Sequence, residues 1–100
     1  PITTSVELGN ALPTTVELSQ NFPNPFNPST TIQYAVPAQS TVRLAVYDML
    51  GREVAVLVNG TKAAGNYEFA FDASALSSGL YMYRLEAAGT VMTRKMTLIK

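Results

Sequence analysis

Apolar and polar residues alternate along most of this chain, which is the pattern of β-strands that bury one face and expose the other. In the segment 30–36, for example, Ile32, Tyr34 and Val36 fall on one face. The segment 52–58 is almost continuously apolar instead, which indicates a strand covered on both faces or an edge strand turned inward. The pattern predicts strands at 16–18, 30–36, 41–48, 52–58, 66–72, 80–87 and 90–100. Short strands separated by turns about every ten residues predict an all-β fold, an antiparallel β-sandwich of about seven strands.

Two kinds of connection are expected between these strands. The stretch from Asp48 to Gly51 has aspartate first and glycine fourth, which suits a type I turn, and Gly51 can adopt the positive φ that lets the flanking strands twist together. The stretch from Asp72 to Gly79 is different, because Asp72 can cap a short helix, Leu76 can fold back onto the core and Gly79 can end the helix. We therefore expect one short helical turn to cross an end of the sandwich.

The least sheet-like segment is 21–28, which reads Asn-Phe-Pro-Asn-Pro-Phe-Asn-Pro. Its prolines fix φ and remove backbone donors. Asn24 and Asn27 each precede a proline, where helical backbone is disfavoured and the amide side chain can close an Asx-turn. Phe22 and Phe26 are expected to press into the core and to make the segment a rigid corner at one end of the sandwich. The alternative is a proline-rich ligand for an aromatic groove on a partner.

Composition removes several classes of function. One hundred residues suit a single domain, and 47% apolar residues exclude wholesale disorder. Seven basic residues balance seven acidic ones, so no broad positive surface is available for nucleic acid. The chain has no cysteine and no histidine, which excludes disulfides and thiolate chemistry and removes the commonest general base and metal ligand.

Little material for catalysis is left. The sequence holds no Gly-x-Ser-x-Gly motif, and no histidine is present to activate a serine. The carboxylates fall at turns or on outward strand faces, where solvated surface is the ordinary role, namely Asp48, Glu53, Glu68, Asp72 and Glu86. We expect a protein without catalytic activity, cofactor, metal or small-molecule substrate.

Residues 1–14 differ from the remainder of the chain, because they hold no aromatic residue and no sustained alternation. Threonine favours extended backbone, so this segment is expected to be a tether, with an extra edge strand as the alternative. The chain starts at Pro1, without an initiator methionine or a signal peptide. We expect a piece of a longer protein, in which residues 1–14 link an upstream part to a domain spanning 15–100.

Four segments are similar, in the same order, to the motifs of one known family. They are 17–32 (ELSQNFPNPFNPSTTI), which contains Pro23, Asn24 and Pro25, then 46–54 (VYDMLGREV), 78–85 (SGLYMYRL) and 95–100 (KMTLIK). Together they resemble the type A C-terminal sorting domains of the type IX secretion system of certain Gram-negative bacteria. The resemblance covers about residues 15–100.

The resemblance implies an immunoglobulin-like sandwich that is a non-catalytic secretion signal for a cargo in the same chain. It implies transit through the periplasm and a final place at the cell surface or outside the cell. The implied partners are the type IX translocon and its shuttle proteins, together with a sortase-like cysteine protease that removes the domain near its N-terminal border and joins the cargo to the surface.

The resemblance also implies which residues carry the signal, namely Lys95, Leu98, Ile99 and Lys100. Pro23, Asn24, Pro25, Asp48, Gly51, Gly79 and Tyr81 belong to motif turns and are expected to be mainly structural. Tyr81 can form a corner hydrogen bond of the kind known in immunoglobulin-type sandwiches. A receptor can pair with the edge of the last strand and read alternate side chains. The ordinary alternative is that Leu98 is core and that both lysines protect an edge strand from aggregation.

Two further classes of protein stay open. One is a passive accessory or carbohydrate-binding module of an extracellular enzyme, and the other is a structural assembly domain like those of flagellar hook-cap proteins. A row of exposed aromatic rings would favour carbohydrate binding, but the sequence has no tryptophan and its tyrosines fall mostly at core positions.

Overall fold

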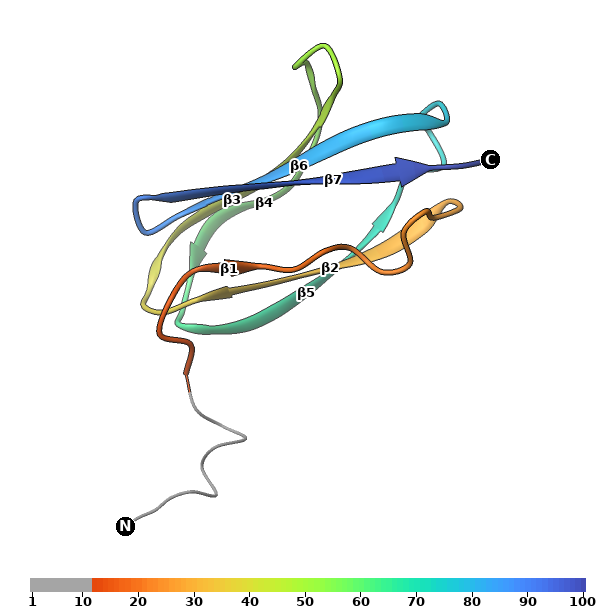
Figure 1. Ribbon diagram of the computed structural model, residues 1–100. Coiled ribbons are helices and arrows are strands. Elements are labelled where there is room, and N and C mark those ends of the chain that lie inside the picture. Colours follow the sequence, from red (N-terminus) through yellow and green to blue (C-terminus); the bar gives the residue numbers. More distant parts are fainter. Residues whose placement is uncertain (1–11) are drawn as a thin grey trace.

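The computed structural model describes residues 12–100, so most of the predicted tether, residues 1–11, lies outside the described residues. The described part is all-β, as the alternation predicted (Figure 1). Its strands are β1 (Glu17–Leu18), β2 (Ser29–Val36), β3 (Ser40–Asp48), β4 (Glu53–Lys62), β5 (Gly65–Asp72), β6 (Gly79–Ala87) and β7 (Thr90–Leu98).

The strands form two antiparallel sheets that pack face to face. The smaller sheet has the order β1-β2-β5 and the larger one β4-β3-β6-β7, and Figure 1 shows them as two layers. In a constant-type immunoglobulin domain the fourth strand pairs with the fifth, whereas here β4 pairs with β3 and joins the other sheet. The larger sheet therefore has β4 and β7 as its two edges.

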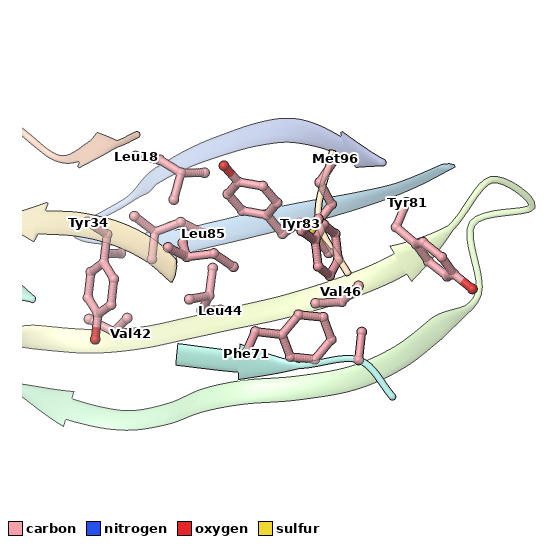
Figure 2. Close-up of a cluster of buried hydrophobic side chains, with 14 of the residues drawn as sticks. Leu18, Tyr34, Val42, Leu44, Val46, Phe71, Tyr81, Tyr83, Leu85 and Met96 are labelled. Carbon is pink, nitrogen blue, oxygen red and sulfur yellow. The ribbon is translucent and has the colours of Figure 1, made fainter. Parts of the chain in front are cut away.

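The core lies between the sheets and is built from alternate strand residues. Figure 2 shows these side chains converging from both layers. Tyr83 and Leu85 from β6 face Ile32 and Val36 from β2, and all four have no exposed surface. Burial of large apolar side chains supplies the main driving force for such a sandwich. The face predicted for 30–36, with Ile32, Tyr34 and Val36 buried together, is therefore confirmed.

The continuous apolar run in β4 has a specific cause. The pairing between β3 and β4 shifts register twice, between Leu44 and Ala45 and between Val46 and Tyr47. Each shift is a β-bulge that leaves one extra residue in β4 and turns two neighbouring side chains inward. Val54 and Ala55, then Leu57 and Val58, consequently pack against the core, while Val56 is 43% exposed. Of the two predicted interpretations, the edge strand turned inward is correct.

The helical turn predicted for the crossover between β5 and β6 is wrong. Asp72 does cap a turn, since its Oδ1 accepts a hydrogen bond from Ser74 N at 2.9 Å, and Leu76 N donates to Ala73 O at 2.9 Å. No second turn follows, since the crossover makes no further helical hydrogen bond and Ala73 is buried in the core. Leu76 packs against the core as expected.

The described part of the chain contains no helix that could span a membrane.

Candidate recognition site at the end of the last strand

The four residues expected to carry the signal do not share one environment. Lys95, Ile99 and Lys100 are exposed, Ile99 by 50%. Leu98 is 1% exposed and belongs to the core between the sheets. The alternation of β7 thus separates a supporting residue, Leu98, from side chains that a partner can reach.

The segment 21–28, called the proline corner below, closes the outer edge of β7. Phe26 N donates to Thr97 O at 2.9 Å, and Ile99 N donates to Phe26 O at 2.9 Å. Asn24 Oδ1 accepts from Thr97 N at 2.9 Å. The outward backbone groups of the end of β7 are therefore already bonded within the domain. A receptor that added a strand here would first have to displace the proline corner.

The chain just before the proline corner is attached to the same edge. Gln20 Nε2 donates to Lys95 O at 2.6 Å, and Arg94 Nε donates to Leu18 O at 2.8 Å. These contacts bridge the two sheets, because Leu18 belongs to β1 of the smaller one. The closed edge of β7 accordingly extends from the carbonyl of Lys95 to the end of the strand.

A buried tyrosine holds this side of the sandwich from within. Tyr83 has no exposed surface, and its Oη donates to Ser19 O at 2.6 Å. Burial raises the pKa of the Tyr83 phenol, so the hydroxyl stays a donor. Because the acceptor lies between β1 and the proline corner, this bond fixes where the corner begins.

The two phenylalanines of the proline corner differ in burial. Phe26 is 1% exposed, with its ring centroid 6.4 Å from that of Phe71, whereas Phe22 is 79% exposed. The prediction that both rings press into the core is wrong for Phe22. Phe22 forms an isolated bridge with Thr31, a residue that points away from the core between buried Thr30 and Ile32. Bridged residues share a face, so the Phe22 ring lies outside.

Polar side chains fix the shape of the proline corner. Asn21 and Thr30 are each 3% exposed, and both donate to Pro23 O, at 3.1 and 2.8 Å. Asn21 Nδ2 also donates to Thr30 Oγ1 at 3.0 Å. Asn24 was expected to close a local Asx-turn, but its side-chain oxygen accepts the hydrogen bond from Thr97 N of β7 instead. Pro25 is exposed. The buried polar groups are thus satisfied, as a rigid corner requires.

The turn from Asp48 to Gly51 has the predicted form. Gly51 N donates to Asp48 O at 3.0 Å, and Gly51 has a φ of 86°. Asp48 Oδ1 accepts from Arg52 N at 3.0 Å and from Leu50 N at 2.9 Å, and Arg52 Nε lies 2.8 Å from Oδ2. These hydrogen bonds, the backbone one from Arg52 first, lower the pKa of Asp48. These bonds hold the shape of the turn, with the Met49 and Leu50 side chains exposed at its tip.

The start of β6 holds Gly79 and Tyr81, two further residues of the motif turns. Gly79 has a φ of 152°, a region that favours glycine. Tyr81 is 8% exposed and its Oη donates to Ser77 O at 2.6 Å, which confirms the predicted corner bond. Figure 2 shows Tyr81 at the end of the buried cluster. Lys100 Nζ donates to Ser74 O at 2.8 Å, so the side chain of this lysine contacts the crossover between β5 and β6.

The described surface offers poor material for other kinds of site. Within residues 12–100, no three histidine, cysteine, aspartate or glutamate side chains are grouped so that they could hold a metal ion. A hollow of about 480 Å³ over the smaller sheet is lined mainly by polar groups, and there Gln33 Nε2 donates to Glu68 Oε2 at 2.8 Å. Phe22 is the one aromatic residue among the large, well-exposed apolar side chains of residues 12–100. One ring does not make the row that binds polysaccharide.

Fold and site define an immunoglobulin-like β-sandwich whose last strand is locked in place along its outer edge while its outward side chains stay accessible. The family model described as "secretion system C-terminal sorting domain" matches residues 20–100. The chain therefore belongs to this family, which confirms the resemblance to type IX sorting domains. No curated protein matches the chain.

Proposed function

We propose that this domain directs a cargo attached upstream in the same chain across the outer membrane through the type IX secretion system. The observation that carries the proposal is the family match, which spans residues 20–100 and so includes the proline corner and all of β7. The domain acts by being recognised, and it performs no reaction on the cargo.

The signal consists of side chains rather than of a backbone edge. Lys95 and Ile99 project from a strand whose outer backbone groups are bonded to the proline corner and to Gln20. Lys100 follows Ile99 in the chain, and its Nζ donates to Ser74 O on the crossover. Leu98 contributes from inside, because its burial anchors the end of β7 beneath the exposed residues.

The family supports further steps of the route. Shuttle proteins and the translocon would receive the folded domain in the periplasm, and a sortase-like cysteine protease would cut within the linker, residues 1–14. Thr14 and Thr15 are exposed and precede Val16, which packs against the core. A cut in this region would leave the sandwich intact and the cargo at the cell surface or released.

The proposal is tested with residues 15–100 fused to a periplasmic reporter in a bacterium that has the type IX machinery. The parent fusion should reach the surface or the medium. Replacing Ile99 and Lys100 with serine should abolish export, because both signal side chains are lost while the backbone bond from residue 99 to Phe26 is kept. Thermal unfolding of the purified domain should stay close to that of the parent.

A matched control removes an exposed β-branched residue and a lysine elsewhere. Val91 lies near the start of β7 and is 61% exposed, and Lys62 ends β4. The variant with serine at both positions should be exported like the parent. Normal export of the Ile99 and Lys100 variant, or retention of the parent fusion in the periplasm, would refute the proposed function.

A further inference from the structure

The exposed residues at the end of β7 belong to a longer row that continues onto β6. In the antiparallel register Lys95 pairs with Met82 and Thr97 pairs with Leu80. Paired residues share one face of a sheet. Because the intervening residues of β6 fill the core, this row lies on the outer face of the larger sheet, and strand alternation adds Ile99 to it.

The row is apolar at the end that lies beside the proline corner. Leu80 is 40% exposed and Ile99 is 50% exposed, with the partly buried Met82 next along β6. Single exposed apolar residues are ordinary on a protein surface, whereas large contiguous apolar patches mark interaction sites. Leu80 lies between Gly79, which has a positive φ, and Tyr81, which forms the corner hydrogen bond.

A single cation stands within this apolar row. The ion pairs among residues 12–100 are Arg43–Glu53, Arg52–Asp48 and Arg84–Glu86. Lys95 takes part in none of them, and its side chain makes no hydrogen bond within the described part of the chain. Its paired neighbour across the strands is the apolar Met82. An unneutralised charge beside apolar surface is complementary to a carboxylate beside an apolar hollow.

We infer that Leu80, Met82, Lys95 and Ile99 form one docking row for a protein of the export machinery that presents a carboxylate next to an apolar hollow. This inference rests on the proposed function and names the chemistry of its partner. Elimination supports it: the backbone edge from Lys95 onward is closed, and the inward side chains are core. At this end of the larger sheet, the outer side chains are the part of β7 that stays accessible. Leu80 and Met82 thereby become recognition residues alongside those of β7.

The row suits this occupant better than it suits two others. A second copy related by a twofold axis would bring the same patch against itself, and this row contains no acid that could pair with Lys95. An anionic membrane attracts clusters of roughly four to eight lysines and arginines, whereas this row offers one cation outside ion pairs. A partner protein with one carboxylate beside an apolar hollow is complementary to both the charge of Lys95 and the apolar surface around it.

The first experiment measures export of the reporter fusion carrying Leu80→Ser or Lys95→Glu. Each should lower the exported fraction about tenfold or more, as expected for loss of a central interface contact. Lys95→Arg keeps the charge and should export like the parent. Val91→Ser is the control, because Val91 lies on the same face at the other end of β7 and is 61% exposed, more than Leu80. Circular dichroism of each purified variant verifies that it is folded.

The second experiment identifies what faces Lys95. A water-soluble carbodiimide joins a lysine amine to a carboxylate in direct contact, forming an amide while the carbodiimide takes up the water that is lost. Treating exporting cells should give an adduct between the fusion and one protein of the machinery, mapped by mass spectrometry to Lys95. The adduct should vanish in Lys95→Arg, although that variant is still exported.

The outcomes separate the two proposals. If the Ile99 and Lys100 variant fails to export but folded Leu80→Ser and Lys95→Glu export normally, the docking row is wrong and the proposed function stands. An adduct that joins two copies of this domain, or export that depends on anionic lipid with no protein adduct at Lys95, would also overturn the inference. If the parent fusion is never exported, the proposed function itself has failed.

Discussion

Replacing Phe26 with alanine should be one of the most damaging single changes in the domain. The ring is 1% exposed and packs near Phe71, so its removal leaves a cavity where the proline corner meets β7. Truncation of a buried phenylalanine costs about 3–5 kcal/mol. Against a total stability of about 5–15 kcal/mol for a domain of this kind, Phe26→Ala should remove about a fifth or more.

The same corner provides a matched control. Phe22 has the same chemistry four residues earlier but is 79% exposed, so Phe22→Ala should change stability by no more than about 0.5 kcal/mol. Urea unfolding followed by far-ultraviolet circular dichroism measures both variants, and this probe suits a chain without tryptophan. If Phe26→Ala is unfolded, Phe26→Leu should give a smaller loss of about 1–2 kcal/mol. Equal losses for the two alanine variants would refute the packing argument.

Two further predictions concern the turn between β3 and β4. Gly51→Val should cost about 1 kcal/mol or more in urea unfolding, because valine is strained at a φ of 86°; Gly60→Val, where an added Cβ also meets open space but φ is not positive, should cost clearly less, and equal costs would show that φ is not the cause. Hydrogen bonds from Arg52 lower the pKa of Asp48, so its carboxylate stabilises the folded state above the unfolded pKa of about 4, and this contribution is lost as pH falls through the lower folded pKa. The difference in urea midpoint between the parent and Asp48→Asn should be largest near neutral pH and fade in acid, and a difference independent of pH would contradict this reasoning.

Much of the fold could be predicted from the sequence because it depends on local periodicity. Alternation of Ile32, Tyr34 and Val36 requires one buried face, and the burial of all three follows from it. Gly51 was predictable for the same reason, since a turn is decided by four adjacent residues. The crossover after Asp72 was not, because a helical cap and a single turn begin with the same residues and only packing of the following chain distinguishes them.

The site was harder to predict, since it is made by contacts between distant residues. Nothing in the neighbouring sequence indicates that the Asn24 side chain accepts a hydrogen bond from Thr97 rather than from its own segment of backbone. Likewise, Phe22 and Phe26 lie in similar local sequence, each before a proline or an asparagine. They differ in the strand that each one bridges, β2 for Phe22 and β7 for Phe26. The sequence motifs put the expected signal near Lys95 and Ile99, whereas the closed edge and the proposed contribution of β6 depend on sheet order and register.

The contacts of the residues that precede the proline corner bear on how this domain can be moved between proteins. The family match begins at residue 20, yet Leu18 is 2% exposed, Arg94 donates to its carbonyl, and Tyr83 donates to that of Ser19. A graft cut at the family boundary would leave an empty slot in the hydrophobic interior and two orphaned donors beneath the export tag. A transplantable tag therefore has to carry these few extra residues, even though the shared motif pattern starts after them.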